Sequence, residues 1–269
     1  MDAYLARLGM DRPRHADAAH LSELQLRHLR TVPFENLSVH LGEEIVLEQK
    51  PLLDKIVGAG RGGFCYELNG AFAALLKDLG YAVTHLQARV FDEDGRLGIP
   101  YDHLVLLVET EDAAGRWLVD VGFGDHTHHP LAFDLREDQS DPAGTFRLVE
   151  TGGEWGDGIH GDHGDLDLYR DGKPQFRIET RPRVLADFTA GAWWHSTSPR
   201  SHFTQSLVCS RLTEDGRLTL SGHTLVTTAH GERHTEQLSD DAAVLAAYRD
   251  HFGIVLDRLP ADPRDATRR

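Results

Sequence analysis

The chain has 269 residues, of which 40% are apolar and 26% charged, and these values are typical of a globular protein with a core of its own. Its formal net charge of −15 argues against a broad nucleic-acid-binding surface, because such a surface needs basic side chains to offset phosphate charge. No run approaches the roughly 20 apolar residues of a membrane span, and two cysteines are too few for a disulfide framework. We therefore expect a cytoplasmic protein with free thiols, without a membrane or nucleic-acid partner.

The first 80 residues predict mainly helices. Asp17 is suited to cap a leucine-rich helix, and Pro51 fits the first turn of another. The residues after Cys65 carry an apolar stripe at helical spacing, made of Leu68, Phe72, Leu75, Leu76 and Leu79. Gly80 is expected to end that helix.

From residue 81 onward the pattern changes to short strands. The expected strands are 81–90, 103–110, 116–123, 146–150 and 176–180. Segments 92–96 and 111–115 have the composition of hairpin turns. The glycine- and aspartate-rich stretch 151–167 is expected to be a surface loop.

The last third predicts a small mixed unit. Residues 184–199 suit a helix that ends by Pro199, and three short strands are expected between residues 206 and 231. Ser239 is a candidate cap for a final helix, and the polar tail 261–269 is expected to fray. Helices followed by strands and then by a small α/β unit indicate a segregated α+β fold.

The stretch "RGGFCYELN" (61–69) raises the question of what Cys65 does. The thiol has four possible roles, as a nucleophile, a metal ligand, a disulfide partner or a small buried residue. Gly62 and Gly63 form a turn that feeds a helix, and they would allow close approach of a bound substrate. The unpaired N–H groups and the dipole at a helix start favour a thiolate at Cys65. A nucleophilic thiolate also needs a histidine, which in turn needs a carboxylate.

His103 and Asp120 are the candidate partners of Cys65. His103 opens an apolar strand, and Asp120 interrupts an apolar run on the next one, where an unpaired carboxylate is costly. A hairpin around 111–115 would bring both residues to the same region of one sheet. The alternative for Asp120 is a strand-edge position that faces water, and sequence spacing alone leaves this open.

Six motifs resemble the arylamine N-acetyltransferase family and occur in the family's order over about 170 residues. They are "VPFENL" (32–37), "RGGFCYELN" (61–69), "HLVLLV" (103–108), "LVDVGFG" (118–124), "RVLADF" (183–188) and "TSPRSHF" (197–203). The resemblance implies an α+β fold of three domains with a cysteine-protease-like catalytic core. The implied parts are a helical bundle (1–88), a β-barrel (89–180), an interdomain helix and linker (181–203) and an α/β lid (204–269).

The resemblance also implies a function and its site residues. Acetyl-CoA would donate an acetyl group to Cys65, from which it would pass to an arylamine, arylhydrazine or hydrazide, with His103 as base and Asp120 orienting it. The implied acceptor-pocket residues are Phe34, Val90, Phe123 and Phe203. The implied CoA contacts are Gly122, Gly124, Asp125 and His126. Acetyl-CoA enters as a co-substrate, and neither a metal nor a tightly bound cofactor is expected.

Three other interpretations remain open. An amide synthase that releases a carrier-bound polyketide chain would use the same three residues, and a thiol hydrolase or transglutaminase-like enzyme shares their order. A non-catalytic binding protein is a further alternative. In the histidine-rich loop 124–130, His126, His128 and His129 suggest either a solvated loop, a CoA contact or, with Asp125, a metal site. The physiological amine, the acyl-chain preference and whether the chain forms a homo-oligomer cannot be inferred from the sequence.

Overall fold

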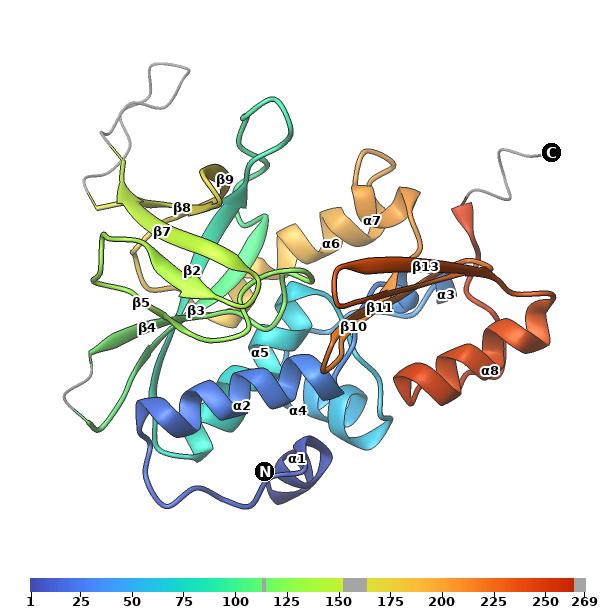
Figure 1. Cartoon of the computed structure of the whole chain (residues 1–269), viewed down its shortest axis with the longest axis horizontal. Coiled ribbons are helices and arrows are strands. Elements are labelled where there is room, and N and C mark those ends of the chain that lie inside the picture. The colour runs from blue at the N-terminus through green and yellow to red at the C-terminus, as the bar shows by residue number, and fades with distance from the viewer. Residues whose placement is uncertain (113–114, 152–163, 264–269) are drawn as a thin grey trace.

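The structure is a computed structural model that describes residues 1–112, 115–151 and 164–263 (Figure 1). It has the α+β architecture expected from the sequence, with helices first, then a barrel-like sheet, then a smaller sheet with a helix. The middle of the predicted turn at 111–115, most of the predicted loop at 151–167 and the end of the tail at 261–269 lie outside the described residues.

The N-terminal part is a set of helices that surrounds one long apolar helix, α5. Its elements are α1 (Asp2–Leu8), α2 (Ala18–Thr31), α3 (Leu37–Leu41), α4 (Gln49–Leu53), the π-helical turn η1 (Asp54–Gly58) and α5 (Cys65–Asp78). Asp17 caps α2 as predicted, since its Oδ1 accepts the His20 N–H at 2.8 Å. The predicted apolar face of α5 is buried and packs on α4 and on the strands β2 (Ala82–Val90) and β3 (His103–Glu109). This position places the start of α5 between the helices and the large sheet.

The middle part is an eight-stranded antiparallel sheet in the order β5-β4-β3-β2-β9-β8-β7-β6. Its strands are β2 (Ala82–Val90), β3 (His103–Glu109), β4 (Arg116–Val119), β5 (Leu131–Ala132), β6 (Gln139–Asp141), β7 (Gly144–Glu150), β8 (Leu166–Arg170) and β9 (Lys173–Ile178). The two edge strands come together through the Gln139 side chain, which bonds both the N–H and the carbonyl of Ala132 at 2.7 and 3.0 Å. The sheet forms a nearly closed barrel, and these two bonds join its edges. Strand β2 crosses the domain boundary expected at residues 88–89.

The C-terminal part is a five-stranded sheet in the order β1-β10-β11-β12-β13, covered by α8 (Figure 1). Its elements are β10 (Cys209–Leu212), β11 (Gly216–Ser221), β12 (Thr224–Ala229), β13 (Glu232–Gln237) and α8 (Asp241–Phe252). The prediction that Ser239 caps α8 is wrong, because Asp240 is the cap and accepts the Ala243 N–H at 2.9 Å. Strand β1 (Phe34–Glu35) belongs to the N-terminal part of the chain, so the expected lid shares its sheet with the helical part.

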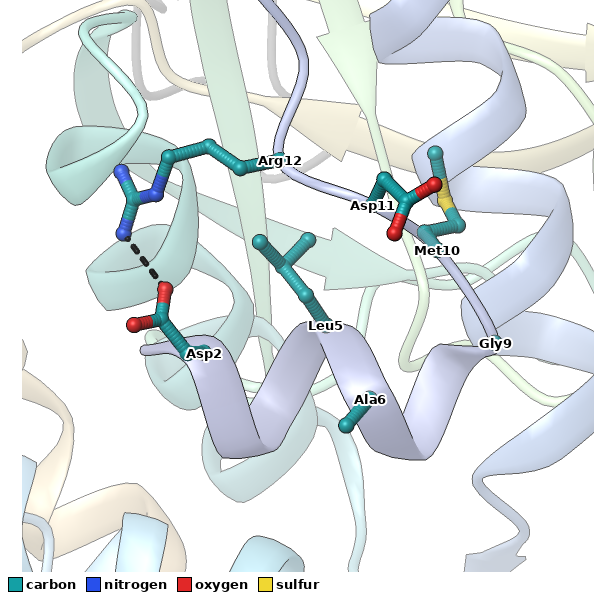
Figure 2. Close-up of a pocket in the computed structure, with 7 residues that line it drawn as sticks. All are labelled: Asp2, Leu5, Ala6, Gly9, Met10, Asp11 and Arg12. Carbon is teal, nitrogen blue, oxygen red and sulfur yellow. Dashed lines mark hydrogen bonds and ion pairs between the residues drawn. The ribbon is translucent and has the colours of Figure 1, made fainter.

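Three short helices, η2 (Leu185–Phe188), α6 (Thr189–Thr197) and α7 (His202–Gln205), connect the two sheets. No helix among the described residues is long and apolar enough to cross a membrane. Figure 2 shows a surface pocket between α1 and the segment that follows it, where Arg12 pairs with Asp2 at 3.1 Å. None of the site residues expected from the sequence lines that pocket.

Candidate active site

Cys65 is the first residue of α5, and the residues before it explain why the helix begins there. Phe64 has extended backbone, and its N–H donates to the Glu67 carboxylate at 3.3 Å. The two preceding glycines allow close packing inside the protein, since a Cβ on Gly62 would lie 1.9 Å from the Pro33 carbonyl oxygen and one on Gly63 would lie 2.6 Å from Glu67. Both glycines are therefore required for packing, and their expected role in the approach of a substrate stays a prediction. Cys65 itself is buried, with 4% of its surface exposed.

His103 and Asp120 lie together as the hairpin predicted. His103 is the first residue of β3, and Asp120 directly follows the antiparallel partner strand β4. The His103 Nε2–H donates to Asp120 Oδ2 at 2.7 Å, and both residues are 2% exposed. Of the two alternatives for Asp120, the structure shows the paired one and not the solvent-facing one. Because Nε2 donates to Asp120, Nδ1 is the ring nitrogen left to interact with Cys65, whose thiol contributes to the raised pKa of His103.

The environment keeps this histidine positively charged. Burial opposes the charge, but the Asp120 carboxylate and the hydrogen bonds to Asp120 and Cys65 outweigh it and raise the pKa of His103 to about 10. For Asp120, burial works against ionisation, but the His103 charge and its hydrogen bonds hold the pKa below the usual value. An imidazolium beside the sulfur stabilises a thiolate, which is the nucleophilic form of cysteine.

Asn69 completes the support of Asp120, and the sequence analysis did not identify it. Its Nδ2 donates to Asp120 Oδ1 at 2.8 Å and to the Leu104 carbonyl at 2.7 Å, while its Oδ1 accepts the Val121 N–H at 3.0 Å. Asn69 lies four residues after Cys65 in α5, so both side chains are on one helix face. That spacing is the signal that could have identified it.

Gly122 brings the segment after β4 against the start of α5. A Cβ at this position would lie 2.6 Å from Cys65 Cα and 2.8 Å from Asn69 Nδ2. The Gly122 N–H also donates to Asp120 Oδ1 at 2.8 Å. Glycine is required here because no side chain fits between the two segments.

Aromatic rings lie beside the cysteine and the histidine. The Phe123 ring packs edge-on against His103, with centroids 5.1 Å apart. Phe203 packs against Phe34 at 6.1 Å and against Phe64, the neighbour of Cys65, at 5.7 Å. These three expected pocket residues, Phe34, Phe123 and Phe203, are only partly buried, which leaves part of each ring accessible. Val90, the fourth, is a partly buried residue of the barrel core at the end of β2.

The histidine-rich loop spreads its side chains in different directions. His126 is 4% exposed, and its ring lies among Phe123, Phe146 and Phe176 at 4.9 to 5.4 Å. Burial lowers its pKa to about 4, so it is neutral at pH 7. His129 instead bonds the Ser22 hydroxyl at 2.8 Å. Within the described residues, no group of three or more His, Cys, Asp or Glu side chains could hold a metal ion.

Asp125, the exposed member of this loop, faces two arginines. Its carboxylate lies 3.6 Å from Arg170 of the barrel and 3.4 Å from Arg217 of the small sheet. Asp125 therefore links the two sheets next to Gly124, whose φ of +97° is a conformation that favours glycine.

The chain matches a family model described as N-acetyltransferase over residues 17–260. Its sequence is 35% identical to an arylamine N-acetyltransferase of Mycolicibacterium smegmatis over 268 residues, which covers 96% of this chain and 93% of the relative. An arylamine N-acetyltransferase of Escherichia coli K12 is 32% identical over 260 residues, covering 96% and 89%.

Solved structures of similar proteins have the same fold. The M. smegmatis arylamine N-acetyltransferase superposes with a TM-score of 0.82 at 34% identity, covering 94% of this chain and 91% of that one. The Mycobacterium marinum arylamine N-acetyltransferase in complex with CoA gives a TM-score of 0.82 at 30% identity, covering 94% and 92%.

Proposed function

The chain belongs to the arylamine N-acetyltransferase family, and we propose that this acyltransferase carries acetyl groups from acetyl-CoA to arylamines, arylhydrazines and hydrazides as a thioester on Cys65. The observation that carries the mechanism is the buried His103–Asp120 pair beside a cysteine at a helix start. The CoA complex of the M. marinum relative supports acetyl-CoA as the donor.

The first half-reaction forms the acetyl-enzyme. The Cys65 thiolate attacks the thioester carbonyl, and the bond between that carbonyl and the CoA sulfur breaks. The departing CoA thiolate takes the proton of the His103 imidazolium, which leaves a neutral histidine. One thioester is exchanged for another, so a thiol suits this step better than a hydroxyl would.

The second half-reaction consumes the thioester. The amine nitrogen attacks the acetyl carbonyl on Cys65, and His103 Nδ1 accepts the proton that the nitrogen loses. Collapse of the intermediate yields the amide and returns the thiolate–imidazolium pair. Asp120 stabilises the imidazolium in both halves and holds the ring in the orientation that presents Nδ1.

Backbone N–H groups at the start of α5 are the proposed stabilisers of the tetrahedral oxyanion. The first N–H groups of a helix have no intrahelical acceptor, and the Cys65 N–H is among them. The positive end of the 14-residue helix points to the same place.

We assign the acceptor pocket to Phe34, Phe123 and Phe203, with Val90 behind them. Phe123 contacts the base, and Phe203 contacts the neighbour of the nucleophile, so a flat aryl ring between them would lie against both reacting groups. For the donor we keep the assignment to the segment that holds Gly122, Gly124, Asp125 and His126. Of these, Gly124 and Asp125 are accessible, whereas the buried Gly122 and His126 would act through the shape of the loop.

The two cysteines allow a matched test, because both are free and buried, and within the part of the chain that the structure describes only Cys65 has a histidine partner. Burial raises the pKa of Cys209 well above its ordinary value, so that thiol stays protonated. We expect Cys65→Ser to lower arylamine acetylation by roughly four orders of magnitude and Cys209→Ser to leave it unchanged, in an assay of CoA release.

Measuring the acyl products and changing the acyl donor separates the alternative reactions. Release of acetate at the transfer rate without an amine would indicate a thiol hydrolase. Activity with a carrier-bound acyl chain but not with acetyl-CoA would indicate an amide synthase. Full arylamine acetylation by Cys65→Ser would overturn the mechanism. A reducing compartment such as the cytoplasm would keep Cys65 as the free thiol that the proposal needs.

A further inference from the structure

A second histidine–aspartate pair, made of the buried His195 and the partly buried Asp102, lies next to the candidate active site. His195 of α6 bonds Asp102 Oδ1 through Nε2 at 3.0 Å, and it bonds the Ser201 hydroxyl through Nδ1 at 3.2 Å. Asp102 immediately precedes His103 in the chain. The order of groups, with a carboxylate on Nε2 and a possible nucleophile on Nδ1, repeats that of Asp120, His103 and Cys65.

Ser201 is nevertheless in no position to act as a nucleophile. It is completely buried, and its hydroxyl accepts the N–H of Phe203 at 3.2 Å as the N-terminal cap of α7. All hydrogen bonds are satisfied when His195 is neutral, because Nε2–H donates to Asp102 and the Ser201 hydroxyl donates to Nδ1. The three side chains therefore satisfy one another's hydrogen bonds, and the Ser201 hydroxyl is buried away from solvent.

Both ends of this set are fixed to the active site. At one end, Asp102 Oδ2 accepts the Val90 N–H at 3.1 Å, and the Asp102 carbonyl accepts the hydroxyl of Tyr66, the residue after Cys65, at 2.9 Å. At the other end, the Ser201 hydroxyl accepts the N–H of Phe203, while Asn36 Nδ2 donates to the Phe203 carbonyl at 2.9 Å. The His195 ring also packs edge-on against the Phe203 ring at 5.2 Å.

Helix α6 is seated closely enough for His195 to reach Asp102. A Cβ on Gly191, one turn before His195, would lie 2.6 Å from the Tyr101 carbonyl oxygen and 2.9 Å from the Tyr66 hydroxyl. His195 and Gly191 lie on one side of α6, and both face the segment that contains Tyr101 and Asp102. The glycine at position 191 therefore allows the close approach of α6 that lets His195 bond Asp102.

We propose that Asp102, His195 and Ser201 form a positioning set that fixes Phe203 relative to His103 and thereby sets the affinity for the amine acceptor. None of the three touches the reacting atoms. The inference rests on the proposed function, in which Phe203 is a wall of the acceptor pocket.

The test separates the two half-reactions. Cys65 acetylation is followed by CoA release after mixing with acetyl-CoA, and the acetyl-enzyme is then mixed with increasing concentrations of an arylamine. We expect His195→Leu to raise the half-saturating amine concentration roughly tenfold, as for one or two lost hydrogen bonds. The same variant should acetylate Cys65 within about threefold of the wild-type rate.

Two further variants keep the test decisive. His195→Gln retains an N–H that can donate to Asp102, so its half-saturating amine concentration should lie between those of the wild type and His195→Leu. It replaces His195→Leu in the test if the leucine variant does not fold. His202→Leu changes an exposed histidine beside Phe203 whose ring nitrogen bonds the Ser206 hydroxyl at the end of α7, and it should behave as wild type.

Three outcomes would contradict the assignment. An unchanged half-saturating concentration in both His195 variants would overturn it, and so would an equal slowing of both half-reactions, which indicates a general structural role. If the wild-type protein forms no acetyl-enzyme, the proposed function itself fails and the inference fails with it.

Discussion

Two histidine–aspartate pairs meet at the start of β3, and they differ in what lies on the other side of each histidine. His103 has a cysteine at a helix start, whereas His195 has a serine that caps a helix and is completely buried. The same arrangement of hydrogen bonds therefore supports a reactive thiol beside His103, whereas beside His195 it fixes the backbone of Phe203 through Ser201. Hydrogen-bond order alone does not make a catalytic site, since the third group must also be able to react.

The two carboxylates give the largest expected contrast. Asp120→Asn should slow Cys65 acetylation by roughly 10³- to 10⁴-fold, because the amide does not stabilise the imidazolium and favours the wrong tautomer. Asp102→Asn should slow it by no more than about threefold and should instead weaken binding of the amine. Single-turnover CoA release measures the rate of Cys65 acetylation. A similar loss of this rate in Asp120→Asn and Asp102→Asn would show that the two pairs do not differ in their roles.

The residues that support each pair give a smaller contrast. Asn69→Ala removes a donor from the ionised Asp120, and we expect Cys65 acetylation to slow by about 10- to 100-fold. Ser201→Ala removes a helix cap and should lower the free energy of unfolding by about 1 kcal/mol. It should leave the acetylation rate unchanged, so rates and urea unfolding measured on both variants form a matched pair. A normal acetylation rate in Asn69→Ala would show that Asp120 needs no such support.

High pH should affect the first pair through the charge on His103. Its folded pKa of about 10 lies above the ordinary value of 6.5, so the charge contributes fully to stability below pH 6.5 and is lost as the pH rises through about 10. Between about pH 8 and about pH 11, wild-type protein should lose a few kcal/mol more unfolding free energy than His103→Gln. Urea unfolding of both proteins at the two pH values checks this, and an equal loss would show that His103 is neutral in the fold.

Much of the first pair could be predicted from the sequence. Cys65, His103 and Asp120 belong to motifs with a fixed order, and the single hairpin between residues 103 and 120 brings the last two together. Asn69 could also have been predicted, since a residue four positions after Cys65 in a helix lies on the same helix face as Cys65. The apolar stripe of α5 and its end at Gly80 follow from periodicity and glycine conformation.

The second pair could not be predicted in this way. Asp102 and His195 are 93 positions apart on elements joined by no hairpin, so only the packing of α6 through Gly191 brings them together. The two-residue strand β1 is similar, because its pairing with β10 depends on tertiary contact rather than on local pattern. His126 was expected at the CoA site from its loop position, yet its ring is buried among phenylalanines from distant strands.

The role of Cys65 as the nucleophile is tested most directly by the mass of the protein after mixing with acetyl-CoA in the absence of an amine. We expect one added acetyl group that maps to the peptide containing Cys65 and disappears when an arylamine is added. A protein that gains no acetyl group, or that carries it on another residue such as Ser201, would contradict the assignment of Cys65 as the nucleophile.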